Sequence, residues 1–132
     1  MAQPSQFELS TEQYIVATHH IASSVADVQF FIAPVKCEVV AVREVHAVAG
    51  SDGSAVTGTI RRCQGTEAAT AGDDLLSATI NLRGSPFDEQ TPALTATTAN
   101  LTLETGNRLS LDVTGTTTNL AGVTITVLLK RV

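Results

Sequence analysis

The residues able to act as nucleophiles are not spaced for catalysis. Covalent catalysis needs a Ser, Cys or Thr beside a general base, and the sequence has no Gly-x-Ser-x-Gly elbow. The stretch Gly50-Ser51-Asp52-Gly53-Ser54 resembles such a motif superficially. Its Asp-Gly pair is a strong turn signal, so we interpret it as the turn of a hairpin. The spacing of Cys37 and Cys63 does not suggest a thiol–imidazole pair with any histidine. The sequence predicts no catalytic residue and therefore no enzyme.

The histidines could in principle ligate a metal, because clustered imidazoles are typical of such sites. His19 and His20 are adjacent, and neighbouring residues of a strand point to opposite faces, so they cannot hold one ion together. His46 could meet one of them across strands. We interpret all three as partly exposed strand histidines. The sequence therefore predicts neither a metal site nor a cofactor.

Paired carboxylates occur at Asp73-Asp74 and Asp88-Glu89. They lack the regular oxygen spacing of a calcium loop, and we interpret both pairs as solvated turns. Acid–base hydrolysis of a glycoside by two carboxylates remains open, but aromatic platforms for sugars are nearly absent, with four Phe, one Tyr and no Trp. No glycine-rich phosphate loop follows a strand and opens a helix.

Composition narrows the class of protein further. Of 132 residues, 43% are hydrophobic and 16% charged, which excludes a disordered chain. The net charge is −5 and the basic residues are scattered, so we expect no nucleic-acid binding. No apolar run approaches the roughly 20 residues of a membrane-spanning helix. The start shows no secretory signal, so we expect synthesis in a cytoplasm, with Cys37 and Cys63 as small, buried, reduced hydrophobes.

The elements that must position any site are strands, because the apolar residues recur with a period of two. The alternation is cleanest at 107–114 and 122–131, where Leu109, Leu111 and Val113 alternate with polar residues in the first segment. The turn at 50–53 is expected to join 37–47 to a hairpin partner. A segment at 66–74 is expected to be a loop, and Leu76, Ala78, Ile80 and Leu82 of 75–82 to point inward. The expected strands are 12–20, 27–32, 37–47, 55–64, 75–82, one or two within 91–103, 107–114 and 122–131.

About eight short strands without a helical period indicate an all-β fold. We predict an antiparallel β-sandwich of jelly-roll type. An immunoglobulin-like sandwich is the second choice, because the sequence has no Trp and no Cys…Trp…Cys spacing. The domain is expected to span 13–132.

The first twelve residues are polar, carry Pro4 and show no pattern, and we expect residues 1–12 to form a flexible arm. The strand-like segment after it could add to the edge of a partner's sheet. Our hypothesis is that residues 1–20 and nearby loops bind a partner, with Phe7, Leu9 and Tyr14 as the candidate contacts.

The C-terminal third is rich in threonine and poor in charge. Twelve of the 19 threonines lie in 91–132, against five charged residues. Neutral strands of this kind risk edge-to-edge pairing in a free monomer. They are suited to a surface that an oligomer covers, although an ordinary neutral sheet face would have the same composition.

Several stretches resemble one family. They are Phe30-Phe31-Ile32-Ala33-Pro34, the strand ending in 42–47, the turn at 49–53, the strand through Ile60-Arg61-Arg62, and the runs 103–116 and 120–127. Over about residues 28–131 they are similar to the head decoration (cement) proteins of tailed bacteriophages. The resemblance rests on turns and strand patterns, so it carries over no catalytic or contact residue.

The resemblance implies a structural protein on the outer capsid surface of a virion, synthesised in the bacterial cytoplasm. Its partner would be the major capsid protein, and a homotrimer is the favoured oligomer. Alternatives are a head-fibre, tail or baseplate module, or a carbohydrate- or ligand-binding β-sandwich. A cluster of exposed aromatic side chains would favour the sugar-binding alternative.

Overall fold

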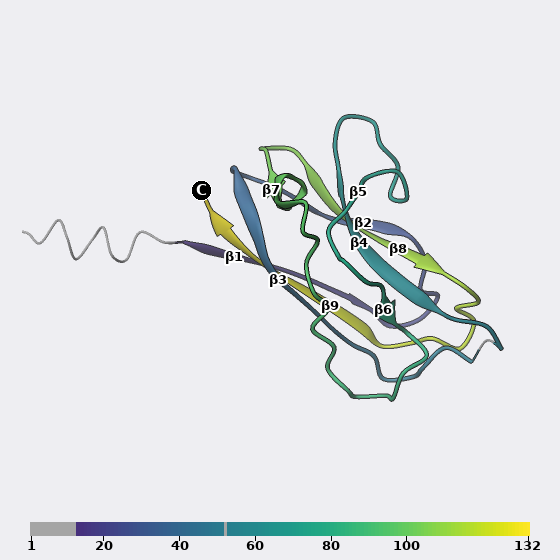
Figure 1. Cartoon of the computed structure of the whole chain (residues 1–132). Coiled ribbons are helices and arrows are strands. Elements are labelled where there is room, and N and C mark those ends of the chain that lie inside the picture. Colours follow the sequence, from purple (N-terminus) through teal and green to yellow (C-terminus); the bar gives the residue numbers. More distant parts are fainter. Residues whose placement is uncertain (1–12, 52) are drawn as a thin grey trace, which may run out of the picture.

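The strands that alternate most regularly in the sequence pair in two antiparallel sheets (Figure 1). The computed structural model describes residues 13–51 and 53–132. Sheet A has the order β1-β9-β3-β7, and sheet B the order β2-β8-β4-β5, with β6 also paired to β4. The strands are β1 (Tyr14–Ile21), β2 (Val28–Ile32), β3 (Cys37–Val45), β4 (Thr57–Cys63), β5 (Asp73–Asp74), β6 (Ile80–Asn81), β7 (Thr102–Leu103), β8 (Arg108–Thr114) and β9 (Val123–Arg131), with a 3-10 helix η1 (Thr98–Leu101) before β7.

The connections confirm the predicted sandwich. The chain crosses between the sheets at each step from β1 to β4 and again from β7 to β9. The short strands β5 and β6 pair with opposite ends of β4, one after the other, and together take one strand position. Two four-position sheets linked in this way have the arrangement of a jelly roll.

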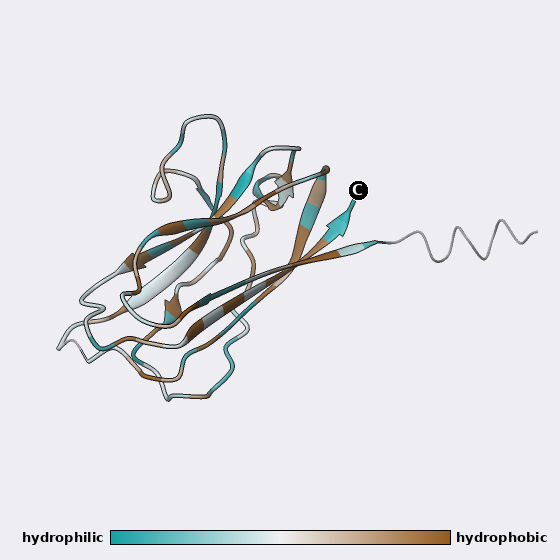
Figure 2. Cartoon of the chain, turned by 180° about the vertical axis from the view of Figure 1, so that it is seen from behind, coloured by the Kyte–Doolittle hydropathy of each residue, from teal (hydrophilic) through white to brown (hydrophobic). Residues whose placement is uncertain are grey.

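The core lies between the sheets and is built by alternate residues. In β9 the side chains of Val123, Ile125, Val127 and Leu129 are buried, while the residues between them face outward. Leu109 and Leu111 of β8 supply the opposing wall, and both are fully buried. In Figure 2 the hydrophobic segments follow the strands, whereas the end of β9 is hydrophilic. Each buried aliphatic side chain contributes roughly 1.5–3 kcal/mol to folding.

The prediction of a hairpin around residues 50–53 is wrong. β3 pairs with β9 and β7 in sheet A, whereas β4 pairs with β8 in sheet B. The chain therefore uses residues 46–56 to cross from one sheet to the other, and turn residues suit such a crossing as well as they suit a hairpin. Turn chemistry reports a change of direction and carries no information about which strands pair.

The strand expected at 75–82 is reduced to β6. Leu75 and Leu76 are both buried although they are adjacent, and Ala78 is exposed, so the period of two breaks. The Leu76 N–H donates to Asp74 Oδ1 (3.0 Å) rather than to a neighbouring strand. The apolar residues reach the core as predicted, with Leu76, Ile80 and Leu82 buried, but from an irregular segment.

The remaining predictions are confirmed in part. Between 91 and 103 the only regular elements are η1 and the two-residue β7. The predicted loop at 66–74 is a loop up to β5. Cys37 and Cys63 are buried and free, as expected. The predicted arm at 1–12 lies outside the described residues.

Candidate assembly surface

The outward face of sheet A is arranged in rows that cross β1, β9 and β3. The central row joins Val16, Leu128 and Ala41, which are register partners. Val16 is 61% exposed, and Val40, beside Ala41 at a register shift in β3, is 42% exposed. The neighbouring rows are Tyr14–Lys130–Glu38, Thr18–Thr126–Arg43 and His20–Thr124–Val45. The central row of this face, which we call the sheet A face, is therefore aliphatic, and the charged residues Arg43, Lys130 and Glu38 lie in the rows on either side of it.

Two shallow hollows lie on the sheet A face. Val16, Ala41 and Leu128 line the first, together with Arg43 and Thr126. The second hollow is also lined by Arg43 and Thr126. Its other lining residues include Val45, Phe87, Glu89 and Thr124. Surfaces with an apolar centre and a polar rim are typical of protein–protein contacts.

Of the three residues predicted to bind a partner, the described part of the chain contains only Tyr14. It lies on β1, which is the edge strand of sheet A, and its side chain is 53% exposed. Phe7 and Leu9 lie outside the described residues. The structure adds Val16, Val40 and Leu128 to this surface, which the prediction missed. The alternation of 122–131 already put Leu128 on the outward face, so its position was visible in the sequence.

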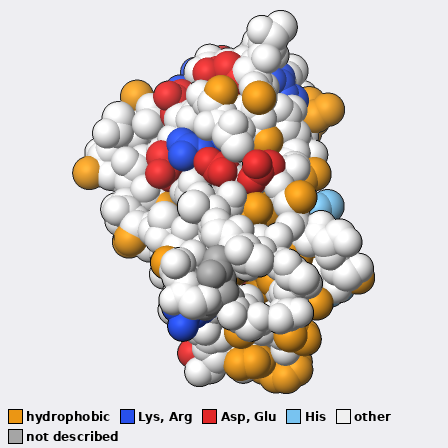
Figure 3. Space-filling view, turned by 90° about the vertical axis from the view of Figure 1, so that its right-hand side faces the viewer, with side chains coloured by type: hydrophobic (Ala, Val, Ile, Leu, Met, Phe, Trp, Pro, Cys, Tyr) orange, Lys and Arg blue, Asp and Glu red, His pale blue; other side chains and the backbone are white. Residues whose placement is uncertain are grey.

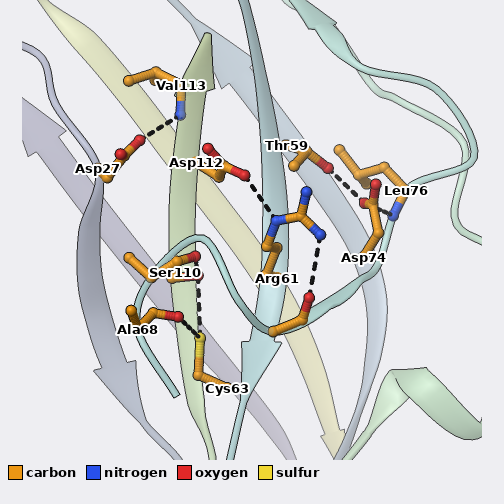
Figure 4. A network of polar contacts seen from close by, with 12 residues as sticks. Asp27, Thr59, Arg61, Cys63, Ala68, Asp74, Leu76, Ser110, Asp112 and Val113 are labelled. Carbon is orange, nitrogen blue, oxygen red and sulfur yellow. Dashed lines mark hydrogen bonds and ion pairs between the residues drawn. The ribbon is translucent and has the colours of Figure 1, made fainter.

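Much of the outward face of sheet B is covered by the chain itself (Figure 4). Arg61 of β4 donates from Nε to Asp112 of β8 (2.8 Å) and from Nη1 to the carbonyl oxygen of Gly72 (3.1 Å). Ser110 donates to the carbonyl of Ala69 (2.7 Å). These bonds hold the loop of residues 64–72 over the sheet. We call this loop and its bonds the sheet B clasp.

The clasp also contains Cys63 and Asp74. The Cys63 thiol lies 3.3 Å from the carbonyl oxygen of Ala68 and 3.4 Å from Ser110 Oγ. Asp74 accepts from Thr59 (2.5 Å), and Asp73 forms an ion pair with Arg62 (2.6 Å). The interpretation of Asp73-Asp74 as a solvated turn is therefore wrong, because both carboxylates are bound by β4.

The pair Asp88-Glu89 is exposed, as a solvated turn would be, although Glu89 forms an ion pair with Arg43. Viewed from one side, the molecule shows charged side chains of both signs close together in its upper half, with hydrophobic atoms scattered among them and a further hydrophobic group at its lower end (Figure 3).

A buried acid–base pair lies inside the sandwich. Glu44 lies on the core side of β3 and His46 follows directly after this strand, and each is 1% exposed. His46 Nδ1 lies 2.9 Å from Glu44 Oε2, and Nε2 lies 3.0 Å from the carbonyl oxygen of Gly84. Gln90 donates to Glu44 Oε1 (2.8 Å). Burial raises the pKa of Glu44, while hydrogen bonds from His46 and Gln90 and the charge of His46 oppose the rise.

The prediction that all three histidines are partly exposed strand residues is wrong for His46. The sequence held a signal for this: Glu44 and His46 continue the alternation of buried positions that includes Val42. His19 and His20 do point to opposite faces. His19 stacks on Phe30 with ring centroids 5.5 Å apart, whereas His20 Nδ1 lies 2.8 Å from the Thr124 hydroxyl.

The arrangement offers little for ligand chemistry. Within 13–51 and 53–132 there is no group of three His, Cys, Asp or Glu side chains that could hold a metal ion. No helix in that part of the chain is long and apolar enough to cross a membrane. Two aromatic side chains are strongly exposed there, Tyr14 and Phe87, but they belong to different parts of the sheet A face. They do not form the cluster that stacks on sugars.

Comparison with known proteins finds a similar fold in a solved structure but no related sequence. No family model matches the sequence, and no curated protein matches it. The structure is similar to a chain in the capsid of Ralstonia phage GP4, with a TM-score of 0.62 and 17% identity, over 90% of this chain and 82% of that one. At this identity the similarity shows the fold alone: the chain is a β-sandwich of a kind also found in a phage capsid.

A second similarity is weaker. It is to a chain in the structure of the infectious bursal disease virus Gx strain, with a TM-score of 0.44 and 11% identity, over 90% of this chain and 32% of that one. At this TM-score it carries no argument about fold or function.

Proposed function

We propose that this chain is a structural protein of a virion, without enzymatic activity, that docks on the outer surface of a tailed-phage capsid and stabilises it. Its partner is the major capsid protein, and it acts as a homo-oligomer, with a trimer favoured. The observation that carries the proposal is the central row Val16–Leu128–Ala41 of the sheet A face, which is uncharged and has no covering segment among the described residues. The fold shared with a chain of a phage capsid supports the same role.

The chemistry of the sheet A face fits docking. Val16, Leu128 and Ala41 form a continuous apolar row, and burying exposed aliphatic surface contributes roughly 25 cal/mol per Å². Threonines 18 and 126 flank the row, with hydroxyl oxygens 3.4 Å apart. They can exchange hydrogen bonds with a partner at little desolvation cost. A rigid sandwich also loses little conformational entropy on binding, and symmetric repetition adds avidity.

The buried acid–base pair supports a role without catalysis. The side chains of Glu44 and His46 are 0% exposed, so neither can touch a substrate in this conformation. A general base must come within hydrogen-bonding reach of the proton that it abstracts. We therefore assign the pair no catalytic role.

Co-sedimentation with purified expanded capsids tests the proposal. The full chain should pellet with capsids, saturate at hundreds of copies per particle and raise the temperature at which the capsids open. Deleting residues 1–12 should weaken pelleting if that segment binds the lattice, as predicted for Phe7 and Leu9. Unchanged pelleting would reject that part alone.

The alternative is another part of the virion: a head fibre, a tail or a baseplate. Copy number separates it from decoration, because a handful of copies per particle indicates a fibre or tail component. Absence of the chain from purified particles would contradict both.

A further inference from the structure

The loop of residues 83–90 is tied to the buried acid–base pair on β3. His46 Nε2 faces the carbonyl oxygen of Gly84 (3.0 Å), and the carbonyl of His46 accepts from the Phe87 N–H (2.8 Å). Gln90 exchanges two backbone hydrogen bonds with Glu44 (2.8 and 2.9 Å) and adds the side-chain bond to Oε1. Each end of this loop therefore has one bond to a buried side chain, at Gly84 and at the Gln90 amide, while the tip at Phe87 is held by the backbone of His46.

The hydrogen-bond geometry fixes how many protons the pair must carry. The Gly84 carbonyl can only accept, so His46 Nε2 carries a proton. Nδ1 faces Glu44 Oε2, so a second proton must lie between these two atoms. The proton can sit on either atom, as imidazolium with carboxylate or as imidazole with carboxylic acid. In both forms every polar atom of the pair has a partner.

Losing the shared proton breaks this arrangement. The neutral ring then has one proton for two acceptors, so a nitrogen lone pair faces either the ionised Glu44 Oε2 (2.9 Å) or the Gly84 carbonyl oxygen (3.0 Å) in a site from which solvent is excluded, with one uncompensated negative charge. A buried charge without a partner is strongly unfavourable. Burial already raises the pKa of the Glu44 carboxyl, which is the direction expected if the site retains a proton.

The loop is poised to move when these bonds weaken. Phe87 has φ +61°, a left-handed conformation that is uncommon for a bulky residue, and its side chain is 78% exposed. Such backbone strain persists only where the surroundings enforce it. The bond from the Phe87 N–H to the His46 carbonyl is one of these constraints.

We propose that one proton shared by Glu44 and His46 holds the 83–90 loop against β3, and that the loop is released when the pair loses this proton as the pH rises. This pH-dependent release of the loop is independent of the capsid role proposed above, because it needs no partner. Phe87 lines a hollow of the sheet A face, so release of the loop reshapes that hollow.

Other charged groups near the pair lie on the outside. The loop carries Arg83, Asp88 and Glu89, and Glu89 pairs with Arg43 of β3. On β9, which pairs with β3 beside Glu44, the charged residues Lys130 and Arg131 are at the opposite end. β6 and residues 115–122 contain no titratable group. Within the described residues, the shared proton is therefore the only titratable proton buried between the loop and β3.

Amide hydrogen exchange from about pH 6 to about pH 9, corrected for the intrinsic rate, tests the proposal. Protection of the Phe87 and Gln90 amides should fall about tenfold or more in the native chain, because an unpaired buried polar group shifts a local equilibrium by at least that factor. Glu44→Gln keeps the hydrogen bonds with a neutral imidazole and removes the shared proton, so its loop protection should not change with pH. Arg43→Gln, which breaks only the exposed pair with Glu89, should behave like the native chain.

Two results would overturn the proposal. One is the same pH dependence in the native chain and in Glu44→Gln; the other is an equal loss of protection at Leu111 in sheet B, which would mean global unfolding. If Glu44→Gln does not fold, the ¹⁵N shifts of the His46 ring in the native chain decide the question. If the His46 ring loses a proton while the protection of the Phe87 amide stays unchanged, the proposal is rejected.

Discussion

The outward faces of the two sheets differ in what covers them. On sheet B, Arg61, Ser110 and Cys63 bind the backbone of the 64–72 loop, so the chain itself covers much of that face. On sheet A, the row Val16–Leu128–Ala41 carries no such covering segment within the described residues. Polar side chains of β4 and β8 are therefore bonded to the chain's own loop, whereas no described segment covers the central apolar row of sheet A.

We infer from this difference that the sheet B clasp stabilises the fold and that the sheet A face makes the contact proposed above. Hydrogen bonds from a partly buried arginine contribute to folding only while their partners stay in place. Exposed valine and leucine contribute little to folding and become favourable when another surface covers them. Substitutions in the sheet B clasp should therefore affect stability, and substitutions on the sheet A face should affect assembly.

The largest expected loss of stability comes from Gly72→Ala. A Cβ at this position would lie 2.3 Å from the carbonyl oxygen of Arg62 and 2.9 Å from Cys63 Sγ, so the clasp must shift. We expect a loss of about 3 kcal/mol, the upper end for an overpacked site. Urea denaturation measures it. Gly53→Ala is the matched control, because a Cβ there meets no atom within 4 Å; equal losses in both variants would reject the role of the clasp.

A smaller loss is expected from Arg61→Gln. It removes the ion pair with Asp112, whose side chain is 14% exposed, and the bond to Gly72. We expect destabilisation by about 1–2 kcal/mol, because Asp112 is left without its charged partner. On the sheet A face, Thr126→Val should change the free energy of unfolding by less than about 0.5 kcal/mol. Denaturation midpoints of the two variants compare the faces directly, and a larger loss in Thr126→Val would reverse the comparison.

The pH dependence of stability should carry the signature of Glu44. Its pKa is raised in the folded chain, so the folded state binds more protons than the unfolded state in the range above the ordinary value of 4.5. The stabilising contribution is complete below that value and is lost as the pH rises through the folded pKa. One group gives a slope of at most about 1.4 kcal/mol per pH unit. Denaturation across this pH range should show that the free energy of unfolding falls less steeply with pH in Glu44→Gln than in the native chain. The same slope in both would contradict the raised pKa of Glu44.

An effect on stability as small as that of Thr126→Val should come from Val16→Glu. The side chain is 61% exposed on the edge strand of sheet A, so it loses little packing when replaced. We expect a change within about 0.5 kcal/mol. Thermal denaturation checks this, and a loss above about 2 kcal/mol would mean that Val16 belongs to the core.

The sequence predicted the sandwich because alternation reports burial directly. Val123, Ile125 and Val127 of β9 are buried as their spacing required. Strand pairing was harder, because the turn at 50–53 is compatible both with a hairpin and with a crossing between sheets. Which side of a sheet is covered depends on contacts across long separations, such as Arg61 with Asp112, that no local pattern encodes.

The candidate site was predicted only in outline. The low charge of the C-terminal third indicated a neutral sheet surface, and β9 with its row of threonines lies at the centre of the sheet A face. The buried Glu44–His46 pair was missed, because a charged residue in an alternating strand is normally assigned to solvent. Its partners, Gly84 and Gln90, lie 38 and 46 residues away from His46 and Glu44 in the sequence.

The central claim is that the sheet A face makes the contact with the virion. Binding of Val16→Glu and Ile32→Glu to expanded capsids tests it most directly, because both positions are exposed aliphatic strand residues, at 61% and 66%, on different sheets. A buried unpaired carboxylate costs several kcal/mol at an interface, so Val16→Glu should weaken binding at least about a hundredfold. Ile32→Glu should bind like the native chain. Loss of binding in Ile32→Glu with native binding in Val16→Glu would contradict the account.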